Sequence, residues 1–145
     1  MKVTFAHLCE YAMMSADRKL SVIGIFSSIR LRSLPGVHPQ MFLAFEVEMN
    51  SAELGKPFTI VVECTDADGA KIFSTKGAGT SEGRVPFGEN PRFAQFLAFR
   101  NTKFTRSGDH GINIWLNDRL EFQYKFQVIV ARPNSAPPSL TPPPK

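Results

Sequence analysis

The most suggestive catalytic pattern in this sequence is GTSEG at residues 79–83, which matches the Gly-x-Ser-x-Gly nucleophile elbow of hydrolases. Asp109 and His110 follow it in the chain and could complete a catalytic triad with Ser81. A working elbow needs a strand that turns sharply into a helix, but residues 84–88 contain proline and glycine and do not favour a helix. We therefore predict that the chain is not an enzyme and has no catalytic residues. A small serine hydrolase that uses Ser81 and His110 is the alternative.

Two further patterns match ligand-binding loops only in part. DADG at residues 66–69 resembles the start of a calcium-binding loop, but the EF-hand spacing would require a glutamate where Gly77 stands. Gly77, Gly79 and Gly83 lack the spacing of a phosphate-binding loop, and no helix is expected after them. We therefore predict a hairpin turn at residues 66–69 and no cofactor.

The histidines are scattered rather than grouped as zinc ligands are. His7, His38 and His110 stand singly, without the paired spacing of a zinc site. His7 and Cys9 are two residues apart and would share one face of a strand, so they could bind a metal only if a third ligand lay close. We predict no metal site, and we expect Cys9 and Cys64 to be buried thiols.

The positive charge is spread along the chain. The 145 residues include 17 Lys and Arg against 13 Asp and Glu, which gives a formal net charge of +4. Nucleic-acid-binding domains usually concentrate such charge in a patch or stripe, whereas here the basic residues alternate with acidic ones. Nucleic-acid binding is therefore disfavoured. Weak binding through Arg30, Arg32 and the basic residues near Arg100 is a second alternative.

The sequence contains no pattern for export or membrane insertion. His7 and Glu10 interrupt the apolar run near the start, which therefore does not resemble a signal peptide. No stretch approaches the roughly 20 apolar residues of a membrane helix. Two cysteines in a chain with this much apolar sequence do not indicate a disulfide framework. We therefore expect a cytoplasmic protein with no membrane partner.

Alternating apolar and polar residues predict a succession of strands. The expected strands span residues 3–10, 20–32, 41–49, 58–65, 71–75, 93–104, 112–116 and 120–130. Gly24 and the Ser27–Ser28 pair are natural places for a bulge or bend within the second of them. In the third strand the alternation predicts that Glu46 and Glu48 face solvent.

The segments between these strands should be turns and loops. We expect a connection at residues 11–19, a loop around Pro35 and Pro39, and a two-residue hairpin turn at Asn117–Asp118. Residues 76–92 are expected to be the longest irregular stretch. Because long loops on a rigid sheet often carry binding sites, residues 77–90 are the first region in which to look for a ligand or partner.

About eight strands without an expected helix favour an all-β fold, an antiparallel β-sandwich of immunoglobulin-like or similar Greek-key type. The 13 phenylalanines suit the dry interior of such a sandwich. The domain should comprise residues 1–132. Residues 133–145 read PNSAPPSLTPPPK, and proline cannot donate to a sheet, so we expect a disordered tail there.

Several segments are similar to a known family. AHLCEYA at residues 6–12, KLSVIGIF at 19–26, DADG at 66–69 and GINI at 111–114 resemble a family of small uncharacterised bacterial β-sandwich proteins, catalogued as a domain of unknown function. The resemblance covers residues 3–130. It implies a fold, but no established activity, cofactor or site residues.

These observations favour a non-enzymatic module that acts through protein contacts, either with a partner or by self-association through an open sheet edge or face. Trp115 and Tyr124 are possible interface anchors, since amphipathic aromatic rings are favoured at interfaces.

Overall fold

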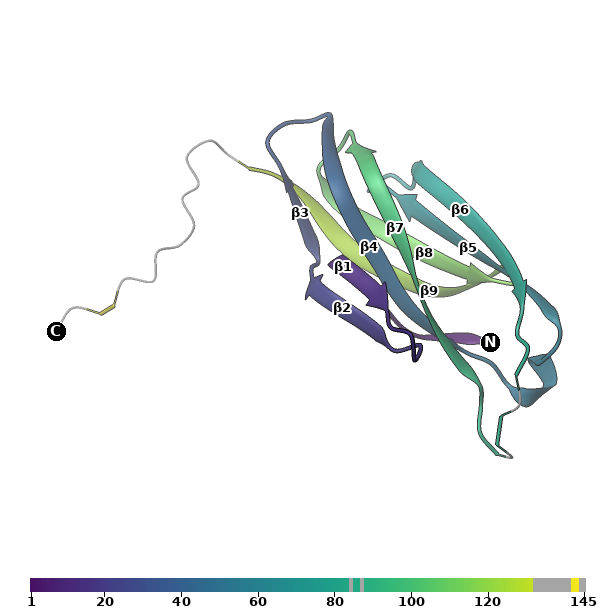
Figure 1. The fold of residues 1–145 in the computed structure, drawn as a ribbon. Coiled ribbons are helices and arrows are strands. Elements are labelled where there is room, and N and C mark those ends of the chain that lie inside the picture. The colour runs from purple at the N-terminus through teal and green to yellow at the C-terminus, as the bar shows by residue number, and fades with distance from the viewer. Residues whose placement is uncertain (84, 87, 132–141, 144–145) are drawn as a thin grey trace.

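The protein is a sandwich of two β-sheets (Figure 1). The computed structural model describes residues 1–83, 85–86, 88–131 and 142–143. The strands are β1 (Lys2–Met14), β2 (Leu20–Ile25), β3 (Ser28–Leu31), β4 (Gly36–Glu48), β5 (Pro57–Thr65), β6 (Lys71–Thr80), β7 (Arg92–Phe104), β8 (Gly108–Leu116) and β9 (Arg119–Val130). The described residues contain no α-helix, and a short 3-10 turn, η1 (Ser51–Glu53), links β4 to β5. The predicted all-β class is confirmed.

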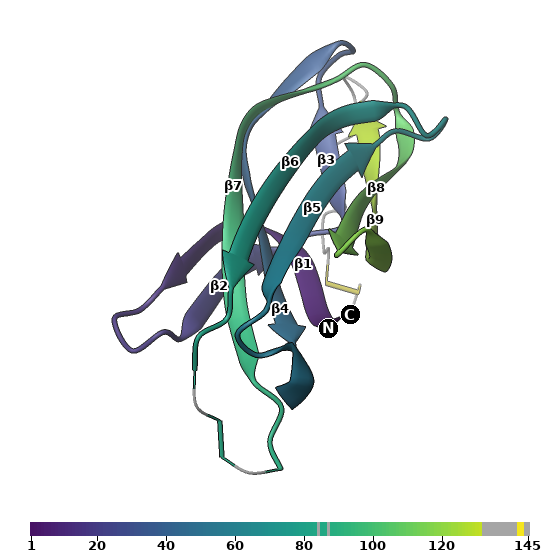
Figure 2. The ribbon, with the colours of Figure 1, turned by 90° about the vertical axis from the view of Figure 1, so that its right-hand side faces the viewer.

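The strand order leaves two edges on the same side of the sandwich. One sheet has the order β2-β1-β4-β7 and the other β3-β9-β8-β5-β6. Neighbouring strands are antiparallel except β3 and β9, which run parallel. The predicted antiparallel sandwich is therefore confirmed. β6 and β7 are edge strands of different sheets and lie along one side of the molecule (Figure 2).

The expected strand over residues 20–32 is divided between the two sheets. Gly24 has a φ of 69°, and β2 ends and β3 begins on either side of Phe26 and Ser27, close to the bend predicted there. The hydroxyl of Tyr124 donates a 2.7 Å hydrogen bond to the carbonyl of Phe26, which holds this crossing. The division accounts for nine strands where about eight were expected.

Three strands are longer than the sequence predicts. β1 continues through residues 11–14, which we expected to be a connection, and pairs there with β2. β6 continues through Gly77 and Gly79 into the stretch expected to be irregular, because it pairs with β5 as far as Thr80. β4 begins at Gly36, inside the expected loop, and pairs with β7. Pairing with a neighbouring strand determines these segments more than their local composition does, so these boundary predictions are wrong.

The core lies between the sheets, with a smaller apolar cluster outside it. Residues that alternate along the strands fill the interior, and Leu8, Leu43, Phe104, Ile112 and Ile114 are completely buried. A second cluster forms where the β1–β2 hairpin packs against β4 and β7. It contains Cys9, Ala12, Phe42 and Ala44, with Leu20, Val22 and Phe96 packed against them. The hairpin thus lies over the outer face of its own sheet and extends past β7 (Figure 2).

The predicted proline-rich tail, residues 133–145, falls almost entirely outside the described residues, so the proposed domain boundary at residue 132 stays a prediction. In the described part of the chain, no helix has the length and apolar character needed to cross a membrane.

Candidate functional site

An apolar cavity opens between the edge strands β6 and β7. Its volume is about 460 Å³. Its apolar wall comes from both sheets and consists of Phe45, Phe58, Ile60, Val62, Phe93 and Leu97. A recess of about 520 Å³ adjoins it and shares Thr75 and Leu97 with it. We call the cavity and this recess together the edge groove.

Two aromatic pairs join the sheets along the edge groove. Phe58 of β5 stacks on Phe93 of β7 with ring centroids 5.5 Å apart, and Phe73 of β6 lies against Phe99 of β7 at 4.4 Å. A Cβ atom on Gly79 would come within 3.3 Å of the Phe58 ring, so glycine lets β6 pass close to that ring. The small residues of β6 therefore leave the apolar floor of the edge groove accessible.

Cations border the edge groove. Arg18 and Lys76 border the cavity, and Arg100 and Lys103 border the adjoining recess. The register of β6 and β7 places Lys76 and Arg100 on the outer faces of their sheets, so these charges lie at the rim and not inside the groove. Among the described residues, none of these four side chains takes part in an ion pair. Glu82 is the one acidic residue in the described lining of either part. The rim of the edge groove is therefore positive.

Arg18 reaches the edge groove from the tip of the β1–β2 hairpin. The turn is closed by Ser15, whose N–H donates to the Lys19 carbonyl and whose carbonyl accepts from the Arg18 N–H, both at 2.9 Å. Arg18 has a φ of 61°, which is uncommon for a residue with a side chain. These hydrogen bonds hold the backbone of the turn and place Arg18 at the cavity between β6 and β7.

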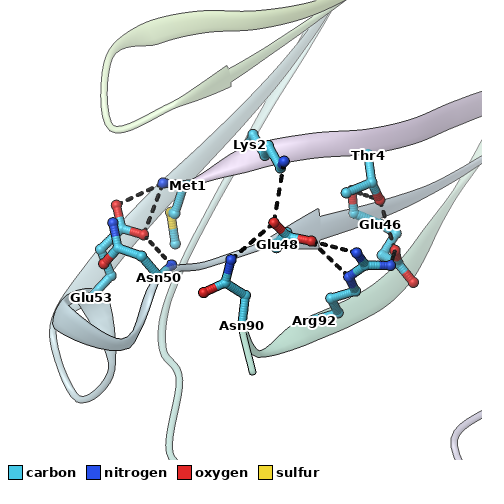
Figure 3. A network of polar contacts seen from close by, with 9 residues as sticks. All are labelled: Met1, Lys2, Thr4, Glu46, Glu48, Asn50, Glu53, Asn90 and Arg92. Carbon is cyan, nitrogen blue, oxygen red and sulfur yellow. Dashed lines mark hydrogen bonds and ion pairs between the residues drawn. The ribbon is translucent and has the colours of Figure 1, made fainter. Parts of the chain in front are cut away.

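A polar network lies beside the edge groove, at the start of β7 (Figure 3). Glu48 accepts from Lys2 Nζ at 3.2 Å, from Asn90 Nδ2 at 3.3 Å and from Arg92 Nε at 2.7 Å. The Glu48 side chain is only 9% exposed, so the prediction that it faces solvent is wrong. The alternation along the strand showed that Glu48 is on its polar face. It carried no information about Lys2 and Arg92, which are distant in sequence and cover the Glu48 carboxylate.

A second carboxylate near this network holds the start of the chain. Glu53 of η1 accepts hydrogen bonds from the ammonium group of Met1 at 2.7 and 2.8 Å and from the Asn50 N–H at 2.9 Å. These donors keep the pKa of Glu53 below its ordinary value. The contact fixes the beginning of β1 against the turn that follows β4.

The ion pairs of Glu48 give a stability that depends on pH. The hydrogen bond from Lys2, with further bonds from Asn90 and Arg92, lowers the pKa of Glu48 below its ordinary value of 4.5. A carboxyl whose pKa is lower in the folded state stabilises the fold above its unfolded pKa, and loses this effect as pH falls through its folded pKa. We expect Glu48→Gln to lower the urea midpoint at neutral pH, with the difference from wild type shrinking below about pH 4. Glu89→Gln, which removes the same charge from an exposed residue, is the control; an equal loss in both variants would contradict the prediction.

The structure does not bring Ser81 and His110 together. At one end of β5, Pro57 pairs with Thr80 of β6, the residue before Ser81. At the other end, Thr65 pairs with Gly111 of β8, the residue after His110. The two residues therefore lie near opposite ends of β5, roughly 25 Å apart at about 3.3 Å per residue. A nucleophile and its base must lie within hydrogen-bond reach, so these residues do not form a catalytic pair.

His110 has a structural environment. It is 3% exposed, and its ring lies against Phe104 and Phe126 with centroids 5.4 and 5.5 Å away. Its Nδ1 is 2.9 Å from the Gly108 carbonyl, and its buried Nε2 has no hydrogen-bond partner among the described residues. His110 therefore serves as a core residue at the start of β8.

Of the two partial metal patterns, residues 66–69 form a turn, whereas His7 and Cys9 lie in different environments. Asp66 Oδ1 accepts from the N–H groups of Asp68 and Ala70, both at 2.9 Å, and Gly69 has a φ of 79°. The predicted hairpin turn at residues 66–69 is therefore confirmed. His7 is exposed whereas Cys9 is completely buried. No group of three potential ligands gathers in the part of the chain that the structure describes.

The remaining predicted residues lie apart from one another. Arg30 and Arg32 line a shallow recess at the β3–β4 turn, whereas Arg100 lines the edge groove. Tyr124 is half-buried and bonded to Phe26, and Trp115 is half-buried with its Nε1 unpaired among the described residues. Neither ring reaches the edge groove.

The edge groove was foreseen only in part. The predicted binding region, residues 77–90, supplies Gly77–Glu82 to its lining. Residues 84 and 87 of that region lie outside the described part of the chain. The contributions of Arg18, Phe93 and Leu97 were missed, because only the sheet order brings the hairpin tip and β7 next to β6.

The chain is similar to solved structures and to one protein family. No curated protein matches it. A crystal structure of an immunoglobulin-like protein from Pseudomonas aeruginosa is similar over 88% of this chain and 94% of that chain, with 13% identity and a TM-score of 0.41. The alkylpurine DNA glycosylase AlkC of Pseudomonas fluorescens is similar over 86% of this chain and 30% of its own, with 12% identity and a TM-score of 0.39. The model of one family, described as a family of unknown function (DUF6941), matches residues 4–129. The chain therefore belongs to this family of unknown function, as the resemblance predicted.

Proposed function

We propose that this protein is a non-enzymatic interaction module that binds an extended segment of a partner protein in the edge groove. The observation that carries the proposal is the apolar cavity between two sheet-edge strands, β6 and β7. An edge strand presents unpaired N–H and C=O groups to which another strand can bond. The separation of Ser81 from His110 supports binding rather than hydrolysis.

Binding of the partner segment as an added strand would use both the free strand edges and the apolar cavity. Backbone hydrogen bonds along β6 or β7 would supply affinity, and every second side chain of the added segment would point into the cavity. The wall formed by Phe58, Phe93 and Leu97 suits apolar side chains. The aromatic pairs across the two sheets keep the groove formed before binding, which reduces the entropy lost on association.

The test uses a synthetic peptide in which valine and threonine alternate, with a fluorescent label for anisotropy measurements. Leu97→Glu places a charge in the cavity wall and should weaken binding by at least about tenfold. Leu120→Glu, at a site that is 45% exposed on β9, is the matched control and should bind as wild type does. Equal affinity in all three proteins would contradict the proposal.

A second measurement on the wild-type protein removes any dependence on how the variants fold. Peptide bound by strand addition should slow amide hydrogen exchange in β6 or β7, because their free N–H groups become hydrogen-bonded. Protection confined to other strands, or none with saturating peptide, would overturn strand addition.

A further inference from the structure

We infer that the segment bound in the edge groove is acidic, with carboxylates that flank its apolar residues. The inference rests on the function proposed above and specifies its partner. It is carried by the four cations of the rim, none of which forms an ion pair among the described residues, against one carboxylate, Glu82, in the lining. An oppositely charged segment would complement this rim, and such complementarity raises specificity and the association rate.

The other cations of the same two strands are neutralised within the protein. Lys71, the first residue of β6, pairs with Glu63 at 3.0 Å, and Arg92, the first residue of β7, pairs with Glu48 at 2.6 Å. Lys76, Arg100 and Lys103, farther along the same strands, have no such partner among the described residues. The unpaired charge of β6 and β7 is therefore concentrated along the edge groove.

The positions of the cations set the length of the segment. Arg18 borders the cavity at the Phe93 end, Lys76 lies beside Thr75, which the cavity and the recess share, and Arg100 and Lys103 border the recess. From Phe93 to Lys103, β7 extends roughly 33 Å at about 3.3 Å per residue. A segment of about ten residues would thus meet Arg18 near one end, Lys76 near its middle, and Arg100 and Lys103 near the other end.

The same charges disfavour a second copy of this chain as the occupant. Two copies of β6 paired about their midpoint by a two-fold axis would place Lys76 next to its counterpart. Like charges opposite one another destabilise strand pairs. A foreign acidic segment is therefore the better match.

The experiment compares three versions of the valine–threonine peptide, whose terminal residues are glutamate, glutamine or lysine. The acidic peptide should bind wild type about tenfold more tightly than the glutamine peptide, and the lysine peptide should bind most weakly. In the double variant Arg18→Gln/Lys76→Gln the preference for the acidic peptide should fall severalfold. Arg30→Gln/Lys125→Gln removes the same charge from exposed sites outside the edge groove and should keep the full preference.

The alternative results separate this inference from the proposed function. Equal binding of the acidic and glutamine peptides would overturn this inference and leave the proposed function standing. Absence of binding by all three peptides would overturn both. Tighter binding of a single-stranded oligothymidylate of about ten nucleotides than of the acidic peptide would overturn the inference in favour of a nucleic acid, since aromatic and cationic grooves also bind such strands.

Discussion

Phe104→Ala is expected to lower the free energy of unfolding by about 3–5 kcal/mol, because it removes a large, completely buried side chain and leaves a cavity. Phe104 ends β7 and lies edge-on to the rings of His110 and Phe126 at 5.4 and 6.1 Å, so the variant also loses these aromatic contacts. Urea unfolding followed by circular dichroism measures the change, and the thermal unfolding midpoint should fall by about 10–20 °C.

A matched substitution on the neighbouring strand separates packing from strand propensity. Val37 of β4 pairs with Lys103, next to Phe104, but is 53% exposed. Val37→Ala replaces a strand-favouring residue by alanine, as Phe104→Ala does, but at an exposed site, and should cost no more than about 1 kcal/mol. A loss below about 1.5 kcal/mol in Phe104→Ala would mean that the region around His110 collapses into the cavity, and would contradict the tight packing around this ring.

The two cysteines are expected to be almost inert toward thiol reagents in the folded protein. Both thiols are free and completely buried, as the sequence predicts. Burial, and to a smaller extent the charge of Asp66, raises the pKa of Cys64 to about 12. Burial also raises the pKa of Cys9. At pH 8 the thiolate of Cys64, which is the reactive form, is thus about three orders of magnitude scarcer than that of an ordinary cysteine.

Labelling with a chromogenic aromatic disulfide tests this expectation. In native buffer the reaction should be slow, and in urea both thiols should react at least about a thousandfold faster. Cys9→Ala leaves Cys64 as the sole thiol, so its rate can be assigned without ambiguity. Rapid labelling of the folded Cys9→Ala variant would show that Cys64 is accessible and contradict its placement in the core.

Local patterns predicted the strands well where the burial of one face controls the sequence. The alternation over residues 58–65 and the turn at Asn117–Asp118, with φ values of 47° and 64°, appear in the structure as expected. Residues 11–14 and 77–80 could not be assigned in this way. Their strand conformation comes from pairing with β2 and β5, which is a property of the register and is absent from the local composition.

The candidate site was less predictable than the fold because it is assembled from distant segments. The glycines of β6 drew attention to residues 77–90, but Arg18 and Leu97 approach them only through the strand order. The GTSEG pattern at residues 79–83, kept only as an alternative, matches a hydrolase motif in sequence without its geometry. A short motif specifies residue types, whereas catalysis requires a distance, and the length of β5 sets that distance for Ser81 and His110.

The parallel pairing of β3 with β9 has a consequence for how the chain is made. Ile29 lies opposite Val128, so the edge of one sheet forms only when nearly the whole domain has been synthesised. Until β9 leaves the ribosome, β3 has no neighbour in its sheet and β8 has only β5. With translation at about 5–20 residues per second, the nascent chain carries these incompletely paired strands for seconds. The exposed charges of Arg30 on β3 and Asp109 on β8 disfavour pairing with other chains during this interval.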